Sequence, residues 1–312
     1  MERELFTSHD GKELSVCYWE NAGDAKAVVL ISHGMSEHAE RYAEFAEYLN
    51  ANGYIVIADD HRGHGRTDPE RLGMAEAGKD LFADTVKDMK ALTDMAKEKY
   101  GLPVILFGHS YGSFLSQAYI EEYSDGIIAC VLSGSALYGK LLASFGALVA
   151  GMKSKKHADE PGKFFVKITF DGYDKKIGEG KNGWLSRNAV NNSKYADDPL
   201  SGFLCSNAFY KYMFGGMKKL AKEKRVKARK DLPVFVIYGS KDYVGNCGKL
   251  TEKLVDKYVK AGLTVEVKRY EGARHELTNE INRAEVFEDV TEFFDNVVSG
   301  KWKEIISEMD EE

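Results

Sequence analysis

Short apolar runs rich in β-branched residues recur along the chain, and each is bounded by residues that favour turns. Runs of this kind are typical of strands whose two faces are both buried. They lie at Ala27–Ser32, Tyr54–Ala58, Val104–Gly108, Ile127–Ser133, Val234–Gly239 and Thr264–Tyr270. Two earlier runs, Glu4–Thr7 and Leu14–Trp19, are joined through Asp10-Gly11 and predict an antiparallel hairpin at one edge. Together these runs predict a sheet of eight strands.

Most of these strands are separated by segments in which apolar residues recur with helical spacing. One stripe covers Tyr42–Leu49 and is followed by Gly53, and another covers Phe82–Ala96 and is followed by Gly101. Glycine is the residue that most often ends a helix, so both stripes have a natural stop. Two more helical patterns lie after residue 239 and over residues 286–297. Such alternation predicts an α/β fold, with a mostly parallel sheet flanked by helices.

One connection between predicted strands is far longer than the rest. The chain runs for 100 residues from Gly134 to Val234, whereas a crossover needs only a few tens of residues. We therefore expect a helical cap inserted over residues 137–230, with a core formed by residues 1–136 and 231–312. Its first part, Leu137–Gly151, is strongly apolar. That part is either a helix packed on the core or a lid that lines an apolar substrate pocket.

Composition narrows the possible partners. The 312 residues include 43 Lys and Arg against 49 Asp and Glu, which gives a formal net charge of −6. Nucleic-acid binding needs clustered basic residues to neutralise phosphates, so no nucleic-acid partner is expected. The basic stretch Met217–Lys230 is either a solvated helix end or a patch that holds the cap near anionic lipid. A transient membrane contact through the cap therefore stays open.

Several features of the sequence also indicate the cellular compartment of the protein. Charged residues open the sequence at the place where a signal peptide has its apolar region, and no apolar run approaches the roughly 20 residues that span a bilayer. The four cysteines are scattered and form no C-x-x-C pair. Free thiols suit a reducing compartment. We expect a cytoplasmic protein.

The segment Gly108-His109-Ser110-Tyr111-Gly112 stands between a predicted strand and a predicted helix. At such a tight corner a side chain on either flanking residue would clash, so glycine is needed at both places. The corner holds Ser110 exposed at a helix N-terminus, where the helix dipole favours developing negative charge. This position is typical of a nucleophile, although an ordinary glycine-rich turn has the same pattern.

A serine hydroxyl is a poor nucleophile until a positioned imidazole takes its proton. Asp242 follows the strand that ends at residue 239, and His275 follows the strand that ends at residue 270. The carboxyl ends of parallel strands meet at one edge, where ligands bind, and the order Ser, acid, His fits this kind of sheet. We therefore predict that Ser110, Asp242 and His275 are catalytic, with His275 as general base and Asp242 orienting its ring.

The tetrahedral intermediate formed by such a serine needs two backbone N–H donors. One is expected from Tyr111, the residue after the nucleophile. The other is expected from Met35, because Gly34 lets the chain turn toward the site after its strand. His33, one residue earlier, is interpreted as a packing and hydrogen-bonding residue beneath this loop.

The chain resembles the monoacylglycerol lipase/lysophospholipase branch of the α/β-hydrolase superfamily. The core motifs of this resemblance are His33-Gly34-x-x-Glu37-His38, Asp60-His61-Arg62-Gly63-His64-Gly65, the serine corner and the loops of Asp242 and His275. Its cap motifs are Trp184-Leu185-Ser186-Arg187 and Asp198-Pro199-Leu200-Ser201-Gly202-Phe203. The resemblance implies a serine ester hydrolase that cleaves the acyl ester of a single-chain lipid, with an acyl tunnel under the cap. The substrate would be a monoacylglycerol or a lysophospholipid.

Motifs for other chemistries are incomplete. The segment 243–250 lacks the first glycine and the final hydroxyl residue of a phosphate-binding P-loop. Residues 275–279 begin like the zinc motif H-E-x-x-H but carry Asn in place of the second His. His61 and His64 lie inside an Arg-Gly-His-Gly turn and are interpreted as structural. We expect neither a metal nor an organic cofactor.

Three alternatives remain open from the sequence. The same fold supports aminopeptidases of the proline iminopeptidase kind, which would need a carboxylate pair in the cap facing the pocket. Asp197-Asp198 is the only adjacent acidic pair in the later half of the cap, and Pro199 after it favours a turn. A general carboxylesterase and a non-catalytic binder are the other two, because fold alone does not fix function. The oligomeric state cannot be read from the chain.

Overall fold

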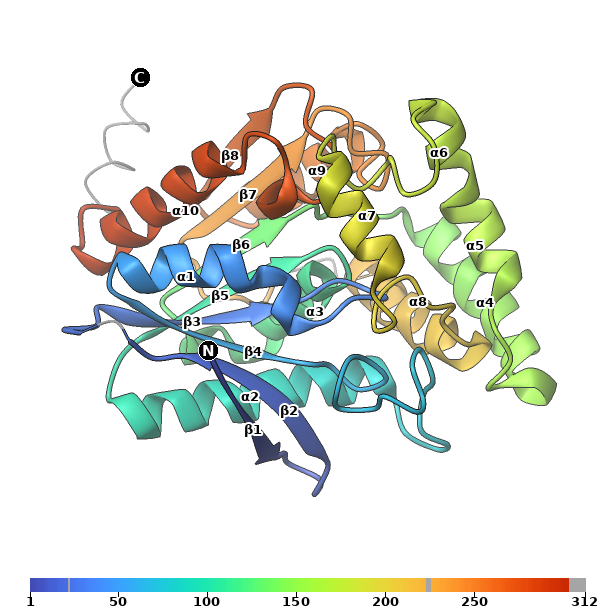
Figure 1. Cartoon of the computed structure of the whole chain (residues 1–312), viewed down its shortest axis with the longest axis horizontal. Coiled ribbons are helices and arrows are strands. Elements are labelled where there is room, and N and C mark those ends of the chain that lie inside the picture. The colour runs from blue at the N-terminus through green and yellow to red at the C-terminus, as the bar shows by residue number, and fades with distance from the viewer. Residues whose placement is uncertain (22, 223–225, 303–312) are drawn as a thin grey trace.

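The computed structural model describes residues 1–21, 23–222 and 226–302. Eight strands form one sheet in the order β1-β2-β4-β3-β5-β6-β7-β8 (Figure 1). Their bounds are β1 Glu2–Thr7, β2 Glu13–Trp19, β3 Ala27–Ser32, β4 Tyr54–Asp59, β5 Val104–His109, β6 Ala129–Ser133, β7 Val234–Gly239 and β8 Val265–Tyr270. The strands from β4 to β8 in this order are parallel, and β1 and β2 are antiparallel additions at one edge. The predicted fold class is confirmed, and so is the edge hairpin.

Side chains alternate between the two faces of the sheet, and a separate helical layer covers each face. In β5, Ile105 and Phe107 point into the layer of α1 (Ala43–Ala51) and α10 (Arg283–Val298). Val104 and Leu106 point into the opposite layer of helices. The helices of that layer are α2 (Leu81–Tyr100), α3 (Tyr111–Tyr123) and α9 (Lys249–Lys260). All four β5 side chains are fully buried, which explains why the strand is apolar throughout instead of alternating with polar residues.

Helix ends follow the predicted signals, whereas one strand end does not. Gly101 ends α2 with a φ of 65°, a left-handed conformation that glycine adopts without strain. Gly53, after α1, has a φ of 89°. The strand predicted at Ile127–Ser133 begins only at Ala129, and the carbonyl of Ile127 before it accepts a hydrogen bond from Arg229 Nη2 at 3.1 Å. Strands β3 and β7 have the predicted bounds, and the remaining strands differ from prediction by one or two residues at one end.

The long connection between β6 and β7 forms five helices among the described residues. They are α4 Lys140–His157, α5 Lys163–Thr169, α6 Asp171–Ile177, α7 Ala189–Asp197 and α8 Asn207–Lys222. Figure 1 shows α4, α5, α6 and α8 gathered beyond one end of the sheet. We call residues 137–230 the cap segment. Because its helix α8 also packs on α2 and α3, the division of the cap segment from the core stays a prediction. No helix in the described part of the chain is long and apolar enough to cross a membrane.

The basic stretch at the end of this segment is only partly described. Residues 223–225 lie outside the described residues. Lys219 pairs with Glu122 of α3, and Arg229 pairs with Asp231 at 2.7 Å. The described basic residues thus include two that bind carboxylates on or next to the core.

The joint between α3 and β3 depends on a missing side chain. A β-carbon on Gly112 would lie 2.0 Å from the carbonyl oxygen of Ser32 and 2.6 Å from that of His33. Backbone atoms cannot yield as flexible side-chain ends can, so α3 can approach the sheet this closely only at a glycine.

We predict that Gly112→Ala lowers the free energy of unfolding by about 3 kcal/mol, because it overpacks a site bounded by backbone. Urea unfolding followed by circular dichroism measures the change. Gly151→Ala in α4 is the matched control: its β-carbon would meet nothing within 4 Å. There alanine should raise stability by about 0.5–1 kcal/mol through its higher helix propensity. Equal stability of Gly112→Ala and wild type would contradict the close approach.

Candidate active site

Ser110 occupies the corner between β5 and α3 in a conformation that non-glycine residues rarely adopt. Its φ is 52° and its ψ is −117°. The backbone N–H of Ser110 donates to the carbonyl of Ser133 in the neighbouring strand at 3.0 Å. The hydroxyl of Ser113 donates to the Ser110 carbonyl at 2.6 Å. A β-carbon on Gly108 would lie 2.2 Å from Ser116 Oγ, so both flanking glycines are needed, as predicted.

The structure brings Ser110, His275 and Asp242 into one hydrogen-bonded chain. The hydroxyl of Ser110 lies 2.8 Å from His275 Nε2, and His275 Nδ1 lies 2.9 Å from Asp242 Oδ2. These residues come from the ends of β5, β8 and β7, which meet at the same edge of the sheet. Asp242 is fully buried, and its other oxygen accepts from the N–H of Val244 at 2.8 Å. Since Asp242 accepts at Nδ1, Nε2 is left to accept the serine proton.

The surroundings of these three residues favour a charged imidazole on His275 beside a charged carboxylate on Asp242. Burial opposes the charge on His275, but Asp242, Glu276 and Glu37 outweigh it, so the pKa of His275 lies above its ordinary value of 6.5. Burial likewise opposes ionisation of Asp242, but His275 and the N–H of Val244 lower the pKa of Asp242 below 3.8. Each partner thus stabilises the charged form of the other.

The loop after β3 lies against Ser110. A β-carbon on Gly34 would be 3.3 Å from Ser110 Cβ, so glycine allows the close approach. Met35 and Tyr111, the two predicted oxyanion donors, line a cavity together with Ser110. Within the described part of the chain, the backbone N–H of neither residue donates a hydrogen bond. Both amides are therefore available to a ligand next to the serine.

Three histidines beneath this loop are fully bonded, as the sequence predicted for His33. Its Nδ1 donates to the carbonyl of Gly34 at 2.7 Å, and its Nε2 accepts from the N–H of His61 at 3.0 Å. The ring stacks on His61 at a centroid distance of 4.0 Å. His61 bonds Asp59 at 2.8 Å, and burial lowers the pKa of His64 to about 3. These rings support the loop and have no free nitrogen for acid–base work.

Two cavities meet at Ser110. A cavity of about 460 Å³ contains polar groups, among them Glu37, Asp174 and Asn182, and also reaches His275. A second cavity of about 240 Å³ is lined mainly by apolar and aromatic side chains, many of them from α4, α5 and α8. The residues common to both walls are Met35, Ser110, Phe170 and Tyr210. The apolar part of α4 therefore lines a cavity, as one of the two predictions for Leu137–Gly151 has it, and α4 also packs on α8.

A buried ion cluster that the sequence analysis did not single out lies behind the polar cavity. Arg41 binds both oxygens of Glu276 at 2.8 and 2.6 Å and also donates to Glu37. Burial opposes ionisation of Glu276, but Arg41 overcomes it, and the pKa of Glu276 falls to about 2. Burial raises the pKa of Glu37. The available signal was the i, i+4 spacing of Glu37 and Arg41, which is common on helices and points to no site by itself.

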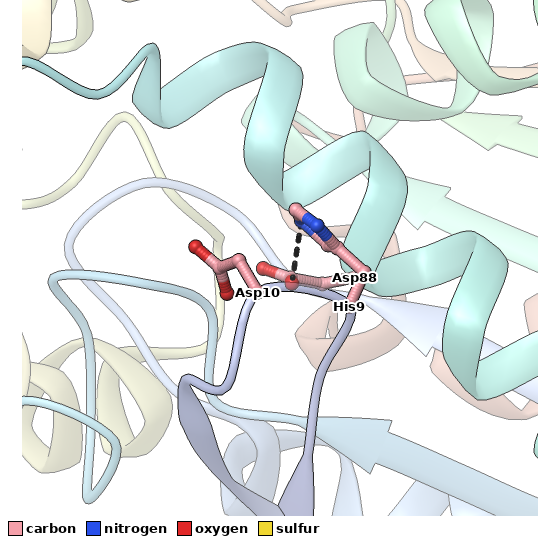
Figure 2. A group of neighbouring side chains, drawn as sticks. All are labelled: His9, Asp10 and Asp88. Carbon is pink, nitrogen blue, oxygen red and sulfur yellow. Dashed lines mark ion pairs between the residues drawn. The ribbon is translucent and has the colours of Figure 1, made fainter.

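Two acids and a histidine lie apart from this site, between the turn of the edge hairpin and helix α2. Figure 2 shows Asp10 and Asp88 beside His9, whose Nε2 lies 3.6 Å from Asp88. Both carboxylates already bind the guanidinium of Arg62, with distances of 2.5–2.9 Å. Lys79 adds a further bond to Asp10 at 2.8 Å. Arg62 thus supplies the positive charge that a metal ion would bring to these carboxylates.

The chain is similar in sequence and in fold to several known proteins. A family model described as serine aminopeptidase, S33, matches residues 23–282. The monoacylglycerol lipase of Mycolicibacterium smegmatis is 30% identical over 287 residues, which cover 92% of this chain and 94% of that protein. The monoglyceride lipase of Mus musculus is 29% identical over 278 residues, covering 87% and 82%. A solved carboxyl esterase from Bacillus coagulans, in complex with glycerol, superposes with a TM-score of 0.85 at 25% identity and covers 95% of this chain and 98% of its own.

Proposed function

Because the chain belongs to the serine aminopeptidase S33 family and has the α/β-hydrolase fold, it is a hydrolase of lipase or esterase type, and we propose that it cleaves acyl esters of single-chain lipids through Ser110, His275 and Asp242. The observation that carries the proposal is the position of Ser110. Its hydroxyl is bonded to an imidazole and stands where an apolar cavity and a polar cavity meet.

In the first half of the reaction, Ser110 Oγ attacks the acyl carbonyl while His275 Nε2 takes its proton. Asp242 keeps the proton on Nδ1 and stabilises the imidazolium that forms. The N–H groups of Met35 and Tyr111 bind the developing oxyanion, and loss of one such donor typically costs about 2.7–4 kcal/mol of transition-state stabilisation. Collapse of the intermediate breaks the ester bond, and His275 gives its proton to the leaving alcohol.

In the second half, a water molecule takes the place of the alcohol. His275 removes a proton from this water, the resulting hydroxide attacks the acyl-serine, and the same two amides hold the second oxyanion. His275 then returns the proton to Ser110 Oγ as the fatty acid leaves. Every step uses groups of this chain and water.

The two cavities suit a substrate with one apolar and one polar end. The acyl chain would lie among the aromatic residues of the apolar cavity, and the alcohol would lie in the polar cavity beside His275. The names of the relatives favour a monoacylglycerol, and the glycerol in the carboxyl esterase complex is the corresponding alcohol. A lysophospholipid has the same single chain and differs only in its head group.

An aminopeptidase activity is the second candidate, since the family takes its name from one. Such an enzyme needs a free carboxylate to bind the substrate ammonium. Glu37 and Glu276 line the polar cavity, but Arg41 binds both of them. Asp198 accepts from His38 at 2.6 Å and is absent from both cavity walls.

Among the described residues, Asp174 is the one cap carboxylate on the polar wall, and its oxygens accept from the backbone N–H groups of Asn182 and Trp184 at 3.0 and 3.3 Å. The predicted aminopeptidase site needs a pair of cap carboxylates there, so this arrangement favours an ester over a peptide.

Helices α4 and α5 carry an exposed apolar surface beside the apolar cavity. Leu141 is 87% exposed and Phe145 58% exposed. The other large apolar residues exposed on these helices are Leu142, Leu148, Met152, Phe164 and Ile168. An apolar surface of this kind marks an interaction site more often than chance. We propose that it contacts lipid aggregates transiently, so that a lipid can enter the cavity without crossing water.

The substrate is tested by a panel at equal concentration: monoacylglycerols of increasing chain length, a lysophospholipid, short-chain esters and an aminoacyl anilide. We expect a preferred acyl length among the monoacyl lipids and no anilide cleavage. Ser110→Ala should lower kcat by about 10⁶ with the fold intact, because the nucleophile is gone. Preferred cleavage of the anilide, or retained ester cleavage in Ser110→Ala, would refute the proposal; short-chain esters alone would indicate a general carboxylesterase.

The acid limb of the pH profile tests the role of His275. The base must be neutral, and its pKa is raised, so kcat/KM should rise with pH with a midpoint above 6.5. Asp242→Asn removes a charge that favours the imidazolium, so the midpoint should move to lower pH while kcat falls by about 10⁴. A wild-type midpoint below 6.5, or one unchanged in Asp242→Asn, would count against this assignment.

Vesicle binding tests the exposed surface of α4. The variant Leu141→Ser/Leu148→Ser changes two exposed residues that line neither cavity. We expect weaker co-sedimentation with phospholipid vesicles and unchanged hydrolysis of a short soluble ester. Val259→Ser, at an exposed site on α9, is the control and should bind as wild type does. Equal vesicle binding by all three proteins would exclude this surface.

A further inference from the structure

We infer that Arg41 is a positioning residue that holds two loops of the proposed active site in register and ties both to helix α7 of the cap segment. The inference rests on the proposed function. Arg41 lies on the 3₁₀ turn Ala39–Tyr42 that precedes α1, and only 8% of its side chain is exposed. It is absent from the walls of both cavities, whereas the two carboxylates that it binds line the polar one. The guanidinium therefore acts from behind the site and does not contact substrate.

The first loop that Arg41 holds is the one that presents Met35. One oxygen of Glu37 accepts from Arg41, and the other accepts from the N–H of Gly34 at 2.6 Å. Tyr42 donates to the same oxygen as Gly34, at 2.8 Å. The peptide between His33 and Gly34, one before that of Met35, is thus fixed by a carboxylate that is itself fixed by Arg41. With the Gly34 N–H occupied by Glu37, the next amide, that of Met35, is left to bind an oxyanion.

The second loop carries His275. Glu276 is its chain neighbour, and Arg41 grips the Glu276 carboxylate with two parallel hydrogen bonds of 2.8 and 2.6 Å. The N–H of Glu276 donates to the carbonyl of Leu185 at 2.8 Å, so backbone and side chain of this residue are both held. One guanidinium therefore fixes the groups next to the oxyanion donor and next to the base. Their separation is set by a rigid planar fork.

The same cluster contacts the cap segment through α7. Asn191 accepts from Arg41 Nη2 at 3.3 Å and donates to Glu276 Oε2 at 2.9 Å. The ring of Tyr195, one turn further along α7, lies 4.7 Å from the Arg41 guanidinium carbon. A displacement of α7 would loosen bonds to Arg41 and to Glu276 together. The position of the cap segment is in this way coupled to the geometry of the reacting groups, and the coupling should affect turnover more than substrate binding.

The test measures kcat per active serine, counted by fluorophosphonate titration, together with KM for a monoacyl ester. Arg41→Met should lower kcat by about 100-fold, the cost of a misplacement on the order of 1 Å, with KM nearly unchanged. Arg41→Lys keeps the charge but loses the fork, and it should lose less. Millimolar guanidinium, but not NaCl at equal ionic strength, should restore part of kcat in Arg41→Met.

Asn191→Ala is a second test of the inference. This variant removes no buried charge, so it can be measured even if Arg41→Met fails to fold. It should lower kcat by about 3- to 10-fold at constant KM, as expected for loss of hydrogen bonds to charged groups. Asn192→Ala is the matched control: the Asn192 side chain donates to the Ser186 carbonyl and not to this cluster. It should keep the wild-type kcat.

Three results would overturn the inference. They are a raised KM at unchanged kcat, which indicates substrate binding; an unchanged kcat per titrated serine in Arg41→Met; and equal effects of Asn191→Ala and Asn192→Ala. Failure of the proposed function looks different, because wild type itself would then show no fluorophosphonate adduct at Ser110. An adduct on wild type with normal turnover in Arg41→Met refutes the role of Arg41 alone.

Discussion

The strained corner at Ser110 is the constraint on which the site depends. A residue with φ of 52° costs of order 1–3 kcal/mol, and surrounding contacts must hold it there. The two flanking glycines let β3 and α3 close around the corner, and the Ser133 carbonyl binds the Ser110 N–H. In return the corner aims the serine oxygen outward and leaves the first amide of α3 without an acceptor. The strain and the chemistry have the same origin.

The ionisable side chains around this corner differ in their hydrogen-bond partners. The histidines beneath the loop are buried away from carboxylates or bonded on both nitrogens, and burial keeps the pKa of His64 low. His275 and His61 each bond a buried aspartate at one nitrogen and a serine hydroxyl at the other. The serine beside His61, Ser32, is fully buried, whereas Ser110 lines both cavities. The two glutamates near it are bound by Arg41. Among these rings, His275 is the one whose hydroxyl partner faces the cavities, so it is the imidazole placed to exchange a proton with a ligand.

The sequence predicted those parts of the molecule that follow from local rules. Strands buried on both faces read as apolar runs, and residues just after parallel strands meet at one edge, so Ser110, Asp242 and His275 could be named together. The bond between Arg229 and the carbonyl of Ile127, just before β6, could not be predicted, because the two residues are about 100 positions apart in the chain. The contacts of Arg41 could not be predicted from the sequence for the same reason. Apart from Glu37, its partners come from two distant segments, and no local pattern indicates that Glu276 and Asn191 will lie beside it.

The wall that the two cavities share would determine the order in which the two products of an ester leave the site. If the acyl chain lies on the apolar side, the alcohol formed first can diffuse out of the polar side while the acyl group stays attached to Ser110. The space that it vacates is the one beside His275, so the hydrolytic water reaches the base by the route the alcohol used. A fatty acid formed in this way would leave Ser110 as a neutral acid, because His275 returns its proton to Ser110 Oγ, and it would then ionise beside the polar cavity that Glu37 and Glu276 line. Repulsion between like charges at its head, and the exposed apolar residues of α4 and α5 near its tail, would both favour release of this product into a lipid phase.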